Sequence, residues 1–368
     1  MDNLIFDVWF SAMLINRQDV YNKLVVKYGS TKDAFELFDK DDLESFSKNE
    51  KEKLLNKDLS IAEKIIKRCE KSGIAIINQD SNYYPDLLKY IDSAPAVLYA
   101  KGNLDKLSGI KITVIGSRQC DKDGINNATR FSKAFNDVGL TIVAGFAPGI
   151  EATVHKSALS TIVVMPCGIN ITYPAMHFRL KNMIIDNGGL FITEYPFDVN
   201  ANKENFKFRN RLLAALSDAT VFVQCGMKSG TAHTFNWTAV YGRDAYVIPG
   251  SINNIFYQGS NGYIKEGGIL ITCPEDVLVD YFTRYPELLY KDNQVPVDEI
   301  KADFNVNDIE GIDEYEKKIL SVLSDKQLHI DQIIKETNLS AGDISVSLIN
   351  LELMDIVVKC EGNTYKIK

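Results

Sequence analysis

The chain has 368 residues, which is enough for two or three domains with a sizeable core. Hydrophobic residues make up 45% and charged residues 24%, as in an ordinary globular protein. The formal net charge of −8 excludes a protein coated in positive charge, so nucleic-acid binding would require a local basic groove in an acidic body. Solubility alone also explains a charge of this size.

Cysteine and histidine usage indicates neither export nor metal binding. The six cysteines are scattered without a C-x-x-C pair, and none of the four histidines has a partner at metal-ligand spacing. The start, MDNLIFDVWF, lacks a basic region followed by a long apolar stretch, and no run of 18 apolar residues occurs. We therefore expect a cytoplasmic protein with no metal, no secretory signal and no membrane segment.

The first 72 residues have a helical pattern. Apolar residues at i, i+3 and i+4 predict short helices at 7–15, 19–29, 31–39 and 60–73. Gly29 and Gly73 stand where helices should end. A small helical domain is therefore expected over 1–72.

From residue 73 to 285 the pattern changes to β-branched runs that alternate with helical segments. Strands are predicted at 111–116, 140–145, 160–166, 189–196, 219–224, 245–250 and 269–272. Near-continuous apolar strands with helices between them indicate a mostly parallel sheet that is covered on both faces. The expected class is α/β, with a doubly wound Rossmann-like core whose ligands bind at the carboxyl ends of the strands.

A polar linker is predicted at 286–311, followed by a C-terminal domain at 312–368. Three helical segments and two short strands around Glu361, Gly362 and Asn363 predict a winged helix. The expected recognition helix, 340–355, contains no Lys or Arg, and residues 313–368 carry more acids than bases. Because DNA docking needs cations against phosphate, we expect this domain to contact protein or itself.

Glycines, hydroxyls, cations and aromatic rings follow the predicted strands. Glycines at these turns let the backbone approach a ligand and leave helix N–H groups free for anions. Arginine suits phosphate because its planar fork donates two parallel hydrogen bonds, and a phenylalanine ring can stack on a base. Together they predict a phosphate-binding groove, formed by Gly116, Ser117, Arg118, Gly145, Gly149, Phe206, Phe208, Arg209, Arg211, Lys228, Ser229, Gly230 and Thr231.

Plainer interpretations of the same residues stay open. The glycines are also compatible with turn geometry alone, Phe206 and Phe208 alternate so that one is expected in the core, and the arginines are compatible with a solvated face. Neither a Walker A loop nor a G-x-G-x-x-G fingerprint is present. His155 has no nucleophile placed with it and is expected to be buried and hydrogen-bonded, so we predict neither an enzyme nor a cofactor.

The ordered motifs resemble the DprA/Smf DNA-processing family over roughly two hundred residues, from about Gly73 to Glu275. They include ITVIGSR, AGFAPGIEATVHKSAL, VVMPCGINITYP, NFKFRNRLLAALS, VFVQCGMKSGT and QGSNGYIKEGGILIT. The resemblance implies a homodimer that binds single-stranded DNA through its Rossmann-like domain and loads the recombinase RecA during natural transformation. It also implies an N-terminal domain of the SAM or helix-hairpin-helix type.

Carried onto this chain, the family motifs assign a set of DNA- and phosphate-binding residues. Arg118, Arg209, Arg211 and Lys228 are the expected phosphate contacts, with Ser117 and Ser229 as supporting donors. The complete set is Gly116, Ser117, Arg118, Gly145, Gly149, Asn205, Phe206, Arg209, Asn210, Arg211, Lys228, Ser229 and Gly230.

The chain also departs from the family pattern. Pro148 stands where the family motif has arginine, which removes a positive charge and a backbone donor and should weaken phosphate binding there. The connection from Ala158 to Thr161 is shorter than usual. The segment from Leu14 to Arg17 lacks the family's glycine-rich hairpin, so DNA binding by the N-terminal domain is not expected.

The function expected from the sequence is sequence-independent single-stranded DNA binding with RecA loading. One alternative is a nucleotide-sensing module that uses the same pocket. Another is a nucleoside-monophosphate phosphoribohydrolase, although Thr234 and Asn236 stand where that family has its glutamate.

Overall fold

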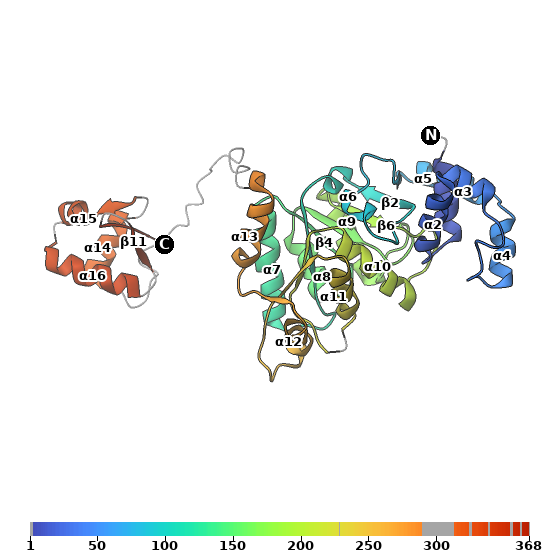
Figure 1. Ribbon diagram of the computed structural model, residues 1–368. Helices are drawn as coiled ribbons and strands as arrows, with labels where there is room; N and C mark the ends of the chain where they lie inside the picture. The colour runs from blue at the N-terminus through green and yellow to red at the C-terminus, as the bar shows by residue number, and fades with distance from the viewer. Residues whose placement is uncertain are drawn as a thin grey trace. The chain divides into compact units, whose positions relative to one another are not determined.

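The computed structural model describes residues 3–227, 229–288, 313–323, 326–337, 339–353, 356–360 and 363–367 (Figure 1). The chain forms two compact units, Met1–Asp292 and Asn293–Lys368, and each is described by itself. Most of the predicted linker and Lys228 lie outside the described residues. None of the described helices combines the length and hydropathy needed to cross a membrane.

The described part of the first unit is organised around a nine-stranded sheet in the order β1-β2-β6-β5-β4-β3-β7-β8-β9. In this spatial order, all strands from β6 through β3 to β9 are parallel to one another. The strands β1 and β2 join the β6 edge in antiparallel pairing. All seven predicted strands are confirmed, and the two antiparallel strands were not predicted. The strands are β1 Ala75–Asn78, β2 Val97–Gly102, β3 Lys111–Ile115, β4 Thr141–Ala144, β5 Thr161–Val164, β6 Leu190–Thr193, β7 Ala219–Phe222, β8 Asp244–Val247 and β9 Ile269–Leu270.

Helices cover both faces of the parallel strands, as the apolar runs predicted. Ile112 and Val114 of β3 pack in one hydrophobic cluster with α7 and α8, while Thr113 between them donates a hydrogen bond to the Leu213 carbonyl of α10 on the other face. The helices of this region are α6 Asp86–Lys89, α7 Lys122–Asp137, α8 Ile150–Ser157, α9 Phe178–Asp186, α10 Lys203–Ala215, α11 Thr231–Val240, α12 Gln258–Lys265 and α13 Glu275–Arg284, with 3₁₀ turns at Leu104–Leu107, Ala175–His177 and Ile255–Tyr257.

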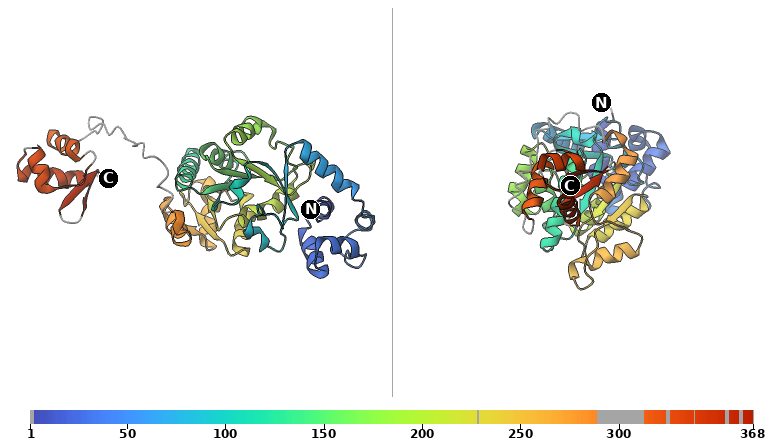
Figure 2. Two further views of the ribbon diagram at one scale, coloured as in Figure 1. Left: turned by 90° about the horizontal axis from the view of Figure 1, so that it is seen from above. Right: turned by 90° about the vertical axis from the view of Figure 1, so that its left-hand side faces the viewer.

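The N-terminal helices pack on the β1–β2 end of the sheet (Figure 2). Trp9, Phe10 and Phe35 form an aromatic cluster that continues into the sheet through Tyr99 and Phe191. These helices therefore share a core and one compact unit with the sheet, where the sequence predicted a domain of their own. They are α1 Leu4–Met13, α2 Gln18–Tyr28, α3 Thr31–Leu37, α4 Lys48–Leu55 and α5 Ser60–Lys71; α4 was not predicted.

The second unit is a winged helix, as predicted. In the described residues its strands pair in the order β10-β12-β11, and β10 was not foreseen. Ile319, Ile333, Leu348 and Tyr365 lie in a separate hydrophobic core. The elements are α14 Glu314–Leu323, β10 Leu328–His329, α15 Ile330–Thr337, α16 Ala341–Leu353, β11 Val357–Cys360 and β12 Thr364–Ile367. A protein-contact role for this unit stays a prediction.

Candidate nucleic-acid interface

A pocket of about 660 Å³ opens at the carboxyl ends of β3 and β7. The chain runs outward from β3 through β4, β5 and β6, then returns to place β7 on the other side of β3, and such a reversal leaves a crevice between the two strand ends. The segments after both strands and one side of α10 line this pocket. It brings together most of the predicted site: Gly116, Ser117, Arg118, Phe206, Arg209, Asn210, Ser229 and Gly230.

Ser117 joins the two loops that form the pocket. Its backbone N–H donates to the Gln224 carbonyl at 2.8 Å. Its Oγ accepts a hydrogen bond from the Gly226 N–H at 3.0 Å and donates to Ser229 Oγ at 3.3 Å. The hydroxyl is therefore committed to holding the β3 and β7 loops together. At Gly116 a Cβ would lie 2.6 Å from Ile150 Cγ1, so the turn leaves no room for a side chain.

Arg118 is an exposed cation at this site. Its guanidinium carbon lies 5.0 Å from the centre of the Phe206 ring, close enough for a cation–π interaction. Among the described residues no carboxylate forms a salt bridge with Arg118. Its charge is therefore available to an anionic ligand in the pocket.

Arg209 lines the pocket from a buried position, with 2% of the residue exposed. Its guanidinium donates to the Val164 carbonyl and, through Nε, to Asn210 Oδ1 at 3.2 Å. Burial lowers the pKa of Arg209, and the nearby Glu151 carboxylate acts in the opposite direction. Because arginine stays protonated in proteins, Arg209 contributes positive potential from the pocket wall.

The start of α8 binds groups of its own chain. The Ile150 N–H donates to the Ser117 carbonyl at 3.2 Å, and the Ala147 N–H donates to Glu151 Oε2 at 2.7 Å. A Cβ at Gly149, whose φ is +83°, would lie 2.5 Å from the Ser117 carbonyl oxygen. Gly149 and Gly145 are not among the residues that line the pocket. The sequence predicted a phosphate site at these two glycines, whereas the structure gives them packing roles.

His155 fixes the loop after β4. Its ring nitrogens lie 2.6 Å from the Gly145 carbonyl oxygen and 2.8 Å from Thr161 Oγ1. Burial lowers the pKa of this imidazole to about 4, so the ring is neutral near pH 7. The prediction of a buried, hydrogen-bonded histidine is confirmed.

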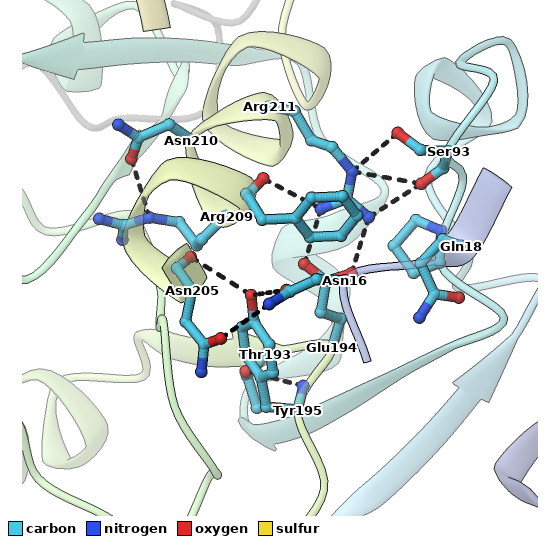
Figure 3. Close-up of polar contacts among 12 residues, drawn as sticks. Asn16, Gln18, Ser93, Thr193, Glu194, Tyr195, Asn205, Arg209, Asn210 and Arg211 are labelled. Atoms are coloured by element: carbon cyan, nitrogen blue, oxygen red, sulfur yellow. Dashed lines mark hydrogen bonds and ion pairs between the residues drawn. The ribbon is translucent and has the colours of Figure 1, made fainter. Parts of the chain in front are cut away.

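Arg211 points away from the pocket, into the interior (Figure 3). Its two terminal nitrogens lie 2.6 and 2.7 Å from the oxygens of Glu194, and one also donates to the Ser93 carbonyl at 2.8 Å. The guanidinium carbon lies 3.7 Å from the centre of the Phe208 ring. The sequence placed Arg211 in the phosphate groove, but its fully buried guanidinium is already satisfied by these partners.

Asn205 also lies outside the pocket. Its Oδ1 accepts a hydrogen bond from Asn16 Nδ2 at 2.9 Å, and its carbonyl accepts one from the Tyr195 hydroxyl at 3.2 Å (Figure 3). The same hydroxyl donates to Asn16 Oδ1 at 2.7 Å. Asn205 therefore ties the first turn of α10 to the N-terminal helices and does not line the pocket where the sequence placed it.

The sequence interpretation missed two lysines. Lys203 and Lys207 line the pocket from the exposed side of α10, and neither forms a salt bridge within the described part of the chain. Their i, i+4 spacing places them on one helix face, which a helical assignment for this segment would have revealed. They supply positive charge to the pocket, whereas Pro148 removes one from the loop before α8.

Known families and proteins match this chain over most of its length. The model of the family described as DNA recombination-mediator protein A matches residues 60–282, and the DprA winged helix domain matches 308–363. The Smf protein of Escherichia coli is 28% identical over 297 residues, which cover 80% of this chain and 77% of that protein. DNA processing protein DprA of Streptococcus pneumoniae is 36% identical over 202 residues, 54% of this chain and 71% of that protein.

Two solved structures share the fold. The X-ray structure of DNA processing protein A from Streptococcus pneumoniae superposes with a TM-score of 0.64 at 30% identity, over 76% of this chain and 97% of that chain. A structure of DNA processing protein A from Helicobacter pylori, which concerns its single-stranded DNA binding mode, has a TM-score of 0.53 at 25% identity, over 58% and 97% of the two chains.

The buried position of Arg211 generates a stability prediction. Arg211→Ala should lower the free energy of unfolding by about 3–5 kcal/mol, because it leaves the Glu194 carboxylate buried without its partner. Urea denaturation followed by circular dichroism measures this change. Arg118→Ala is the control, since an exposed side chain should change stability by no more than about 0.5 kcal/mol. Equal effects of the two substitutions would contradict the assignment of Arg211.

Proposed function

Because the chain belongs to the DNA recombination-mediator protein A family, we propose that it binds single-stranded DNA without sequence preference and loads RecA onto the bound strand. The observation that carries the proposal is the pocket at the strand ends, where Arg118, Lys203 and Lys207 present positive charge without carboxylate partners among the described residues. The single-stranded DNA binding of the Helicobacter pylori relative supports it. We place this activity in the cytoplasm.

The chemistry of the pocket suits a sugar–phosphate backbone. The Arg118 guanidinium can donate two parallel hydrogen bonds to one phosphate, and the lysine ammonium groups act as point charges beside it. Such contacts go to phosphate and carry no sequence information. A local cluster of cations also explains how a chain with a net charge of −8 can bind a polyanion.

The states of Glu151 and His155 favour binding over catalysis. The Glu151 carboxylate is committed to the Ala147 N–H, and the His155 imidazole is buried and neutral. Thr234, which is 1% exposed, stands where the phosphoribohydrolase motif has its glutamate. We therefore propose a mediator that performs no covalent chemistry on its ligand.

A nucleotide sensor is the second candidate, and the pocket volume is the observation that favours it. Small-molecule sites usually enclose about 300–1,000 Å³, and the pocket of about 660 Å³ falls in this range. A mononucleotide could place its phosphate beside Arg118 and its sugar against Gly226 and Gly230. Direct comparison of ligands distinguishes the two candidates.

The full-length chain should bind a dT oligomer with submicromolar affinity, little preference for duplex and a steep salt dependence. Arg118→Ala should weaken binding about 10- to 100-fold, because it removes a charge-assisted contact to phosphate. It should also reduce the slope of log K against log salt by about one. Fluorescence anisotropy at several salt concentrations measures both changes.

Lys64→Ala on α5 is the matched control, since it removes an exposed cation that does not line the pocket. It should leave the affinity for the dT oligomer within twofold of that of the original chain, because no phosphate contact is lost. Unchanged affinity in Arg118→Ala would place the DNA elsewhere. Tight binding of a mononucleotide with weak binding of the oligomer would favour the sensor.

RecA loading should depend on strand binding. The original chain should accelerate RecA-dependent ATP hydrolysis on single-stranded DNA that is covered by a single-strand-binding protein, and Arg118→Ala should remove this acceleration. Lys64→Ala should retain it. A normal acceleration by a variant that no longer binds DNA would separate the two activities and contradict this part of the proposal.

The proposal includes a homodimer formed through the sheet-containing unit. The strand β9 lies at the edge of the sheet and leaves Ile269 and Leu270 43% and 51% exposed, which favours this edge as the contact. Leu270→Glu should halve the mass measured by light scattering, because it places a charge in the apolar contact, while Lys64→Glu should not change it. A monomeric original chain at micromolar concentration would contradict the dimer.

A further inference from the structure

The segment from the loop after β5 to the first residue of α9 exposes three large side chains that are mainly apolar. Tyr173, Met176 and Phe178 are 40%, 77% and 60% exposed. Large apolar side chains that gather on the surface of a folded unit mark a binding site more often than those scattered singly. The pocket does not include these three residues, so the proposed phosphate site leaves them unexplained.

Tyr173 lies directly beside the pocket. Its ring centre is 5.6 Å from that of Phe206, with the planes inclined at 65°, and Phe206 lines the pocket. Two guanidiniums, those of Arg118 and Arg209, already lie over the Phe206 ring, at 5.0 and 5.7 Å from its centre. The Phe206 ring therefore already contacts two cations. Tyr173 extends the aromatic surface beyond the residues that line the pocket.

The segment that carries Tyr173 is anchored to the pocket wall. His177, at the end of the 3₁₀ turn Ala175–His177, lies with Nδ1 3.1 Å from the Phe146 carbonyl oxygen. The rings of His177 and Phe146 also pack edge to face, with centres 5.0 Å apart. The next residue, Ala147, lines the pocket. Tyr173 is thus held in place relative to the cations, and little ordering is needed when a ligand arrives.

We propose that Tyr173 forms a nucleobase-stacking subsite next to the phosphate site. The inference rests on the proposed function, because a base reaches Tyr173 only when its neighbouring phosphate is held by Arg118. Tyr173 is 40% exposed, and within the described part of the chain no hydrogen bond ties its hydroxyl, so the side chain can meet a ligand. Stacking on an aromatic ring tolerates every base, which is what binding without sequence preference requires.

The test compares two oligomers that have the same phosphates. Tyr173→Ala should weaken binding of a dT oligomer about 5- to 100-fold, the effect of losing one base–aromatic stack. It should leave binding of an abasic oligomer of equal length unchanged, since that ligand has no base to stack. Tyr173→Phe keeps the ring and should bind both oligomers like the original chain. Fluorescence anisotropy of the full-length protein measures all affinities.

Arg118→Ala separates this inference from the proposed function. It should weaken both oligomers equally, because both present phosphate. If Arg118→Ala weakens both while Tyr173→Ala weakens neither, the phosphate site stands and the stacking subsite is overturned. If Tyr173→Ala weakens the dT and abasic oligomers alike, its effect is not stacking, and the subsite is again overturned. Failure of the original chain to bind either oligomer overturns the proposed function itself.

A spectroscopic variant covers the case in which Tyr173→Ala does not fold. Tyr173→Trp places a fluorophore at the subsite, and its emission should be quenched by the dT oligomer and not by the abasic one. The buried Trp9 and Trp237, which is stacked on Tyr241, remain as a constant background in the parent chain. Equal quenching by both oligomers would contradict base stacking.

Discussion

The buried ion pair between Arg211 and Glu194 sets the position of α10, and the pocket depends on that helix. A charge pair removed from water is stable only with close geometry and further hydrogen bonds. Here the pair is close, and the hydroxyl and carbonyl of Ser93 accept further hydrogen bonds from Arg211. Because Glu194 directly follows β6, the pair ties α10 to the end of the sheet. Other positions of the same helix, Lys203 and Phe206 among them, line the crevice. A side chain that never touches ligand thus orients those that line the site.

The three arginines of the predicted groove differ in how deeply they are buried, and each has a different role. Arg118 is exposed and free to bind an anion, Arg209 is buried in the pocket wall, and Arg211 is fully buried with an acidic partner. Since a buried guanidinium keeps its charge, Arg209 still contributes to the potential that an approaching phosphate meets. The energetic cost of burying it is offset by the Val164 carbonyl and by Glu151 nearby.

The sequence predicted the parallel strands and the loops that follow them, because buried strands are continuous apolar runs and their carboxyl ends must meet at one edge. It missed β1 and β2, which pair antiparallel at the β6 edge and have only the four-residue helix α6 between them to mark the pattern. It also predicted an alternating pattern of side chains for residues 205–211, which lie in the helix α10. In a helix, positions two apart point in nearly opposite directions, which is why Arg209 and Arg211 separate. The partner of Asn205 was beyond reach, since Asn16 lies 189 residues away.

Glu151 explains why the proposed strand runs along the rim of the pocket. Its carboxylate caps the loop before α8, so the buried wall of the pocket already holds a negative charge beside Arg209. A phosphate that entered to this depth would meet like charge, whereas the exposed cations at the mouth attract it. The backbone is therefore favoured at the mouth, with its bases directed across the surface that Tyr173 occupies. The path proposed for the phosphates therefore follows from the acidic groups as well as from the basic ones.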